Sequence, residues 1–144
     1  MSWEDCAKDE IGTRYYDGTL EGIRYLVLRG PVSINAYLGI PDNHPMAGMD
    51  YDDIDLDVHG GLTFSKIGDG ETWPKGYYWF GWDYAHAGGD KSFYQLDYPM
   101  MGIDIPGYAE IGWTPEMIFD EVKEAIPKLA WLLRERQLNT NSQE

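Results

Sequence analysis

The chain has 144 residues, a length typical of one domain, and its 43% hydrophobic and 15% aromatic content can build a folded core. Its formal net charge of −14 argues against a general DNA- or RNA-binding protein, which needs a basic surface. No apolar run approaches the roughly 20 residues that span a bilayer, so we expect no membrane partner. The N-terminus lacks a signal-peptide pattern, and a lone Cys6 forms no internal disulfide, so we expect a cytoplasmic protein.

Two strand-like segments come first in the chain. The run IRYLVLRG, residues 23–30, is apolar and β-branched, and INAYLGIP, residues 34–41, follows after Pro31 and Ser33. We expect these two runs to form a hairpin. Residues 1–22 give only weak signals.

The segment DYDDIDLDVHGG, residues 50–61, is the most unusual stretch. From Asp53 to His59 acidic or imidazole and apolar residues alternate strictly, which is the period of a half-buried strand. No Lys or Arg lies between Arg29 and Lys66. The aspartates therefore are solvated, paired with a distant cation, protonated, or bound to a metal.

The second half of the chain predicts one more hairpin and a helix. LTFSK, residues 62–66, and the aromatic run at 77–84 read as neighbouring strands, with Gly81 at a bulge or a close approach. Residues 91–112 look irregular. Thr114 as N-cap and Pro115 at the first helical position begin an amphipathic helix.

The predicted fold is α+β: an antiparallel β-sheet packed on one face by the C-terminal helix. Pro127 lies inside the helical pattern and removes a backbone hydrogen bond, which predicts a kink or a break there. We expect a single domain over residues 1–138 and a disordered tail over 139–144.

Each of the three histidines lies beside Pro or Gly, at a strand end or in a loop. They are either solvent-facing turn residues or members of one site. A hairpin between the strands on either side of residue 70 would bring the His59 region opposite the end of the 77–84 strand. We therefore predict a cleft in which three residues are catalytic: His59, His86 and Asp83. Its predicted metal ligands are His44, His59, His86, Asp57 and Asp90.

Mixed histidine and carboxylate ligands suit Zn²⁺, Mn²⁺ or Fe²⁺, which activate a bound water or hold a phosphate. Without a metal, an Asp–His pair serves as orienter and general base. A calcium loop of the EF-hand type is excluded, because Val58 stands where the turn needs Gly and Phe64 where a Glu should be. The three alternating aspartates Asp53, Asp55 and Asp57 are called the aspartate ladder below. Alternatively, this ladder is a solvated acidic edge that resists aggregation.

The aromatic strand at 77–84 offers two alternatives. Most of its rings are expected to pack in the core, while one face, including Trp82, is a candidate to stack a planar ligand.

The segments YLVLRGP, YLGIPDNHPMAGMDYDD, VHGGLTF and WFGWDYAHAGGD resemble a family of small uncharacterised proteins of phages, prophages and bacteria. The resemblance covers roughly residues 25–90 and implies a shared polar site in a phage or mobile-element setting. It marks six further ligand-binding candidates: Asp50, Tyr51, Asp52, Asp53, Gly60 and Gly61. The second glycine of HAGGD departs from the family pattern and puts the equivalence of Asp90 in doubt.

Two functions are consistent with these features. The first is a metal-assisted hydrolase of a phosphoester or nucleotide-like small molecule. The alternative is a non-enzymatic acidic protein of the phage anti-defence type, which binds a basic host protein surface or sequesters a small signalling molecule. If a phage encodes the chain, the expected location is the host cytoplasm.

Overall fold

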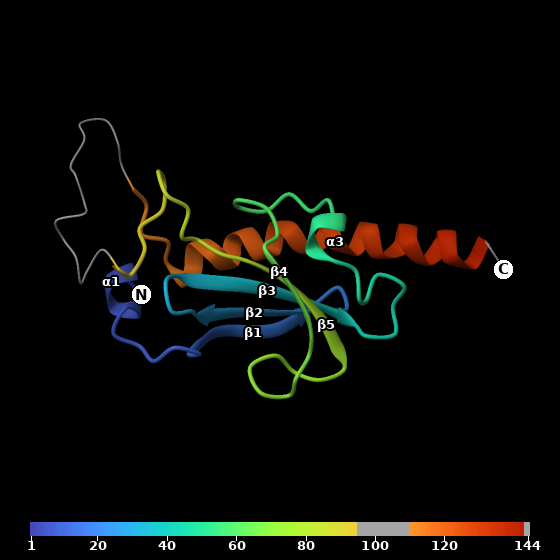
Figure 1. Ribbon diagram of the computed structural model, residues 1–144, viewed down its shortest axis with the longest axis horizontal. Coiled ribbons are helices and arrows are strands. Elements are labelled where there is room, and N and C mark those ends of the chain that lie inside the picture. The colour runs from blue at the N-terminus through green and yellow to red at the C-terminus, as the bar shows by residue number, and fades with distance from the viewer. Residues whose placement is uncertain (95–109, 143–144) are drawn as a thin grey trace.

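The computed structural model describes residues 1–94 and 110–142, and its centre is one five-stranded antiparallel sheet (Figure 1). The strands are β1 (Arg14–Leu20), β2 (Ile23–Arg29), β3 (Ile34–Pro41), β4 (Phe64–Ile67) and β5 (Tyr77–Trp82), in the order β1-β2-β3-β5-β4. The helical elements are α1 (Trp3–Cys6), the 3₁₀ turn η1 (Tyr51–Asp53) and the long α3 (Pro115–Ser142). The predicted α+β class is confirmed.

Both predicted hairpins form. β2 pairs with β3 antiparallel, and β4 pairs with β5 with Phe64 opposite Gly81. Gly81 is a close approach, because a Cβ there would lie 2.5 Å from the Tyr37 ring. β1 was not predicted, since Asp17 and Gly18 are poor strand formers. β1 lies at the edge of the sheet, where the Asp17 carboxylate forms ion pairs with Arg14 at 3.0 Å and with Arg24 at 3.1 Å.

Helix α3 covers one face of the sheet and makes the main core with it (Figure 1). Its buried residues recur at helical spacing and pack against β1, β2 and β3. The buried helix residues are Ile118, Val122, Ala125, Ile126, Leu129 and Ala130. The opposite face carries a smaller apolar cluster around Tyr37 and Trp79, covered in part by the loop that holds Trp73.

The predicted break at Pro127 does not occur. α3 begins where expected, with the Met117 N–H donating to Thr114 Oγ1 at 3.3 Å, and it runs without interruption to Ser142. Pro127 is exposed, so its ring points to solvent, and the buried turns on both sides hold the helix together. The predicted tail stays a prediction: residues 139–142 continue α3, and 143–144 lie outside the described residues.

The strand predicted for residues 53–59 is also wrong. The segment forms η1 and then extended chain outside the sheet. The alternation in the sequence nevertheless predicts correctly which side chains are buried. Ile54, Leu56 and Val58 lie in the main core, while the aspartates between them are exposed. A period of two shows which side chains face inward, whether or not the backbone pairs with a strand.

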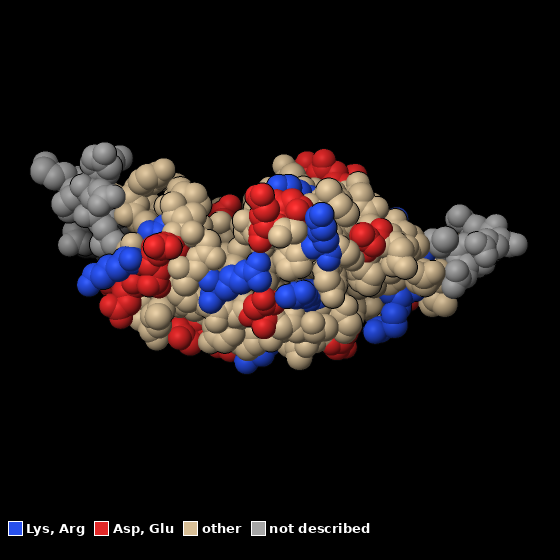
Figure 2. Space-filling view, turned by 90° about the horizontal axis from the view of Figure 1, so that it is seen from below, with Lys and Arg blue, Asp and Glu red and all other residues tan. Residues whose placement is uncertain are grey.

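The charged side chains on the face seen in Figure 2 are mixed in sign. Lys and Arg are interspersed with Asp and Glu over that face, so no continuous basic patch stands out among the residues described there. Among the described helices, none combines the length and the hydropathy that crossing a membrane requires.

We predict that Pro127→Ala stabilises the protein by about 1–3 kcal/mol, because alanine restores a backbone donor and has a much higher helix propensity. Chemical denaturation of both proteins measures the change. Glu135→Ala, at another exposed position of the same helix, is the control and should change the free energy of unfolding little. A destabilised Pro127→Ala variant would contradict a continuous helix.

Candidate functional site

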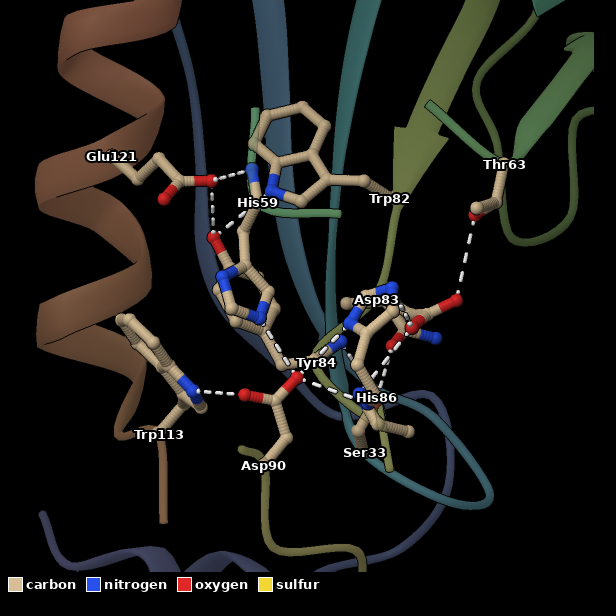
Figure 3. Close-up of polar contacts among 12 residues, drawn as sticks. Ser33, His59, Thr63, Trp82, Asp83, Tyr84, His86, Asp90, Trp113 and Glu121 are labelled. Atoms are coloured by element: carbon tan, nitrogen blue, oxygen red, sulfur yellow. Dashed lines mark hydrogen bonds and ion pairs between the residues drawn. The ribbon is translucent and has the colours of Figure 1, made fainter. Parts of the chain in front are cut away.

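Three parts of the chain that are distant in sequence meet at one end of the sheet, where β5 ends and α3 begins (Figures 1 and 3). The extended segment after η1 contributes His59, and the loop after β5 contributes His86 and Asp90. Trp113, two residues before the first residue of α3, completes the group. The carboxylate of Asp90 is the common partner of all of them.

Asp90 accepts four hydrogen bonds although its side chain is only 2% exposed. Its Oδ2 atom lies 2.7 Å from His59 Nε2, 3.0 Å from His86 Nδ1 and 3.0 Å from the backbone nitrogen of His86. Its Oδ1 atom accepts from Trp113 Nε1 at 2.7 Å. A carboxylate offers about four lone-pair sites, so this one is saturated.

A tight turn presents Asp90 to its donors. The Asp90 N–H donates to the carbonyl of His86 at 3.0 Å, and Gly88 takes a left-handed φ of 97° that suits glycine. A short parallel bridge then ties Asp90 to Ile111, through hydrogen bonds from Lys91 N and to Gly89 O. This bridge brings Trp113 to the site.

The His59 ring is enclosed by three other rings. It stacks on Tyr84 with centroids 4.8 Å apart and an interplanar angle of 6°. It meets His86 edge-on at 5.1 Å and Trp113 at 4.9 Å. Its backbone N–H donates to Glu121 Oε1 at 2.8 Å, so both the ring and the backbone of His59 are fixed.

A second hydrogen-bond chain lies behind His59 and reaches α3. Trp82 Nε1 donates to the Tyr84 hydroxyl, which donates to Glu121 Oε1, each at 2.9 Å (Figure 3). Burial raises the pKa of the Tyr84 hydroxyl, the hydrogen bond from Trp82 lowers it, and the neighbouring Glu121 carboxylate raises it further. The net pKa is raised, so Tyr84 is a neutral donor at physiological pH.

The pKa of Asp90 reflects the same competition. Burial raises it, but the hydrogen bonds from His59, from the His86 backbone and from Trp113 lower it more, so the pKa lies below its usual value. Asp90 is therefore a carboxylate that holds imidazole N–H groups and is itself held as an anion.

Those bonds also fix the tautomers of the two rings. A neutral His59 donates from Nε2, and a neutral His86 donates from Nδ1, which leaves the other nitrogen of each ring as a free base. The remaining nitrogen of His86, Nε2, lies 3.6 Å from Asp83 Oδ1, longer than a hydrogen bond. This distance agrees with two acceptors facing each other.

The structure brings together four of the predicted site residues: His59, His86, Asp83 and Asp90. Gly60 also belongs there, because a Cβ at its position would lie 2.2 Å from His86 Nε2. Gly61 has no atom within 4 Å of such a Cβ. The close approach that a glycine permits is thus to His86 itself.

His44 does not join the group. Its Nδ1 accepts from the Met46 N–H at 3.0 Å, so its Nε2 donates to the carbonyl of Leu133 at 2.9 Å, which anchors the loop to α3. Asp57 has a 94% exposed side chain 3.8 Å from Lys128 and does not touch Asp90. Neither residue belongs to the one metal-compatible group found among the described residues.

The ligand-binding candidates of the acidic segment serve other roles. Asp50 caps η1, with its Oδ1 accepting from the Asp52 N–H at 3.1 Å, and Asp52 and Asp53 are exposed. The Tyr51 N–H donates to Ser65 at 3.3 Å. Trp82 is 1% exposed and donates to Tyr84, so its ring lies in the core and is not open to a planar ligand.

Sequence reasoning missed Tyr84, Trp113 and Glu121. The one available signal was at Glu121, which interrupts the apolar face of the helix between Ile118 and Ala125. A charged residue on a buried face needs a partner there, and the partner is the His59 backbone and Tyr84.

Within residues 1–94 and 110–142, the side chains of His59, His86 and Asp90 form a group able to hold a metal ion, with one ligand atom from each within 4.8 Å of the others. In a tetrahedral zinc site with bonds of about 2.0–2.1 Å, neighbouring ligand atoms lie about 3.3 Å apart. The 2.7 and 3.0 Å distances to Asp90 Oδ2 are shorter and are those of hydrogen bonds. Binding of a metal through these atoms therefore requires that each ring carry its proton on its other nitrogen and that the group open slightly.

Comparison of the chain with protein-family models, with curated proteins and with solved structures finds no match. The resemblance of residues 25–90 to a phage protein family therefore stays a prediction.

We predict that Gly60→Ala displaces His86 whereas Gly61→Ala does not. Both glycines have positive φ, 70° and 79°, so both variants carry similar backbone strain. Only at position 60 does the added methyl group overlap the His86 ring. Imidazole resonances in NMR spectra of the two variants measure the difference, and equal shifts in both would count against this packing.

We predict that Asp90 makes the protein sensitive to acid. Because the folded pKa of Asp90 is below the unfolded pKa of about 3.9, its contribution to stability is complete above that value and is lost as pH falls toward the folded pKa. The free energy of unfolding of the wild type should therefore fall more steeply below about pH 4 than that of Asp90→Asn. Parallel curves for the two proteins would rule out this role.

Proposed function

We propose that the protein is a hydrolase whose acid–base centre consists of His59 and His86, both oriented by Asp90. The observation that carries the proposal is the single buried carboxylate that accepts from both imidazoles and from Trp113. Such a carboxylate sets the tautomer and the direction of each ring, as an orienting group does for a general base. With one ring neutral and the other protonated, the pair supplies one base and one acid for a hydrolytic step.

The surrounding charge restricts the substrate. A polar hollow of about 390 Å³ opens beside His59 and contains Asp57, Glu121 and Glu124, with Lys128 as its basic residue. On the other side, Asp83 stands 3.6 Å from His86. This field repels anions, so a metal-free centre acts on neutral or cationic substrates such as esters or amides.

A metal-bound form of the same centre is the alternative for phosphoester substrates. His59, His86 and Asp90 would hold a divalent ion such as Zn²⁺, Mn²⁺ or Fe²⁺, with each ring proton moved to the nitrogen that faces away from the ion. Its charge would offset the acidic surroundings, activate water and hold a phosphate. The ligand set within 4.8 Å supports this form, and the short distances to Asp90 support the metal-free one.

We predict that His59→Ala and His86→Ala each lower hydrolysis of p-nitrophenyl acetate by about 10²-fold or more, the usual contribution of a positioned acid or base. Asp90→Asn should lower it as well, because an amide cannot accept from both rings and Trp113. His44→Ala is the control, since its ring contacts Leu133 and Met46 far from Asp90. Thermal melts identify variants that fail to fold, and full activity in a folded His59→Ala/His86→Ala protein contradicts the proposal.

Metal analysis decides between the two forms. We expect protein purified without chelator to hold less than one equivalent of metal and Zn²⁺ to raise its melting temperature little. If the protein retains one equivalent of metal, and if Zn²⁺ or Mn²⁺ raises the melting temperature of the wild type but not of His59→Ala/His86→Ala, the metal-bound form is correct. In that case bis-p-nitrophenyl phosphate becomes the test substrate.

A binding function without turnover is the second candidate, and a separate surface favours it. An apolar groove of about 660 Å³ runs between the extended segment after η1 and α3, lined by Leu56, Pro127 and the 55% exposed Trp131. Its rim carries the exposed carboxylates of Asp55 and Asp57, the second of which lies 3.8 Å from Lys128, so the rim is acidic on balance. An apolar groove with an acidic rim fits a basic, amphipathic segment of another protein. The cytoplasmic location and the phage setting remain predictions under either function.

A further inference from the structure

A second cavity lies on the helix-free face of the sheet, next to the proposed acid–base centre. It has a volume of about 190 Å³ and is lined by Asn35, Tyr37, Thr63, Phe64, Trp82 and Asp83. Water occupies about 30 Å³ per molecule in the liquid, so this space equals about six waters, or one long side chain. Figure 3 shows Asp83 between Thr63 and His86, so the lining residue Asp83 separates the cavity from the ring of His86, whose Nε2 lies 3.6 Å from Asp83 Oδ1.

The cavity contains one anionic acceptor, the Asp83 carboxylate, beside the neutral polar groups of Asn35, Tyr37 and Thr63. Asp83 is 37% exposed and, among the residues that the structure describes, receives two hydrogen bonds, from the Ala85 N–H at 3.3 Å and from the Thr63 hydroxyl at 3.4 Å. Its carboxylate therefore keeps acceptor capacity toward the cavity. The Tyr37 hydroxyl oxygen receives one long contact from Asn35 at 3.5 Å and is a further acceptor.

The charge and the rings of the cavity select the same kind of ligand. None of the lining residues is basic, so a bound cation would have no competitor for Asp83 inside the cavity. Tyr37 and Phe64 lie edge to face with centroids 5.3 Å apart, and aromatic rings attract cations through their faces. A planar guanidinium has five donors for the available oxygens and stacks well on such rings.

We propose that this cavity is a specificity pocket for a guanidinium-bearing side chain, with Asp83 as its anionic anchor. Asp83 is then a binding residue, and the catalytic role predicted for it from the sequence is replaced by this one. The pocket itself does not depend on the proposed function, but its role in catalysis does. If the protein is a hydrolase, a substrate whose guanidinium is held at Asp83 presents the ester or amide bond of the same residue to His86. Arginine-containing peptides or arginine esters are the substrate class that results.

Calorimetric titration with Nα-acetylarginine amide, and with its neutral analogue Nα-acetylcitrulline amide, tests the pocket. The two ligands have nearly the same shape and differ in charge. We expect saturable binding of the arginine compound at millimolar concentration or below, and at least tenfold weaker binding of the citrulline compound. Asp83→Asn should weaken binding of the arginine compound at least tenfold, whereas Asp120→Asn removes one distant exposed charge and should leave it unchanged.

Binding is measured in His59→Ala/His86→Ala as well as in the wild type, so that the two proposals fail separately. Retained arginine binding in this variant supports the pocket even if the protein hydrolyses nothing. Hydrolysis of p-nitrophenyl acetate without arginine binding supports the acid–base centre and overturns the pocket. Equal affinity for the two ligands, or full affinity in a folded Asp83→Asn variant, also overturns it.

Discussion

The carboxylate of Asp90 is the interaction on which this end of the molecule depends. Burying an ionised carboxylate is unfavourable unless donors replace its water, and here four donors do so from three separate parts of the chain. The hydrogen bonds to Asp90 also hold the donors in place. They therefore fix the segment before Gly60, the turn after β5 and the start of α3 relative to one another. Removing the carboxylate would leave two imidazoles and one indole N–H without a common partner, and none of the three segments is paired with the sheet there.

A second carboxylate, Glu121, completes the support of His59 from the helix side. Asp90 binds the ring of His59, while Glu121 binds its backbone and the Tyr84 hydroxyl on which the ring stacks. The position of an imidazole is set by both its backbone and its χ angles, and this site restrains both. Glu121 lies on the face of α3 that packs against the sheet. The position of the helix therefore determines where the backbone of His59 is held. The fold therefore positions the proposed base through its own core packing.

The sequence predicted the sheet, both hairpins and the C-terminal helix, because each follows from local composition and periodicity. It also indicated His59 and His86, since glycines beside a histidine mark a tight approach, and Gly60 does lie against the His86 ring. It failed where the outcome depends on contacts between distant segments. The aspartate ladder shows the alternation of a strand, yet the pattern only requires that Leu56 and its neighbours be buried. Trp113 carries no local signal at all, because the Asp90–Ile111 bridge that brings it to the site is long-range. His44 has a sequence context like that of the other histidines. Its hydrogen bond to the Leu133 carbonyl depends on tertiary packing, which the sequence does not show.

His86 stands between two carboxylates that differ in environment, and the difference suggests separate roles. Asp90, on the Nδ1 side, is 2% exposed and in the metal-free site saturated with donors, so there it serves to hold the two rings and Trp113. Asp83, on the Nε2 side, is 37% exposed, keeps free acceptor capacity and borders a cavity. A buried carboxylate with fixed donors orients, whereas an open one with spare lone pairs binds. Because the proton of neutral His86 is committed to Asp90, its free nitrogen faces the open side, where a ligand anchored at Asp83 would arrive. The same ring thus connects the part of the site that is built for rigidity with the part that is left open to solvent.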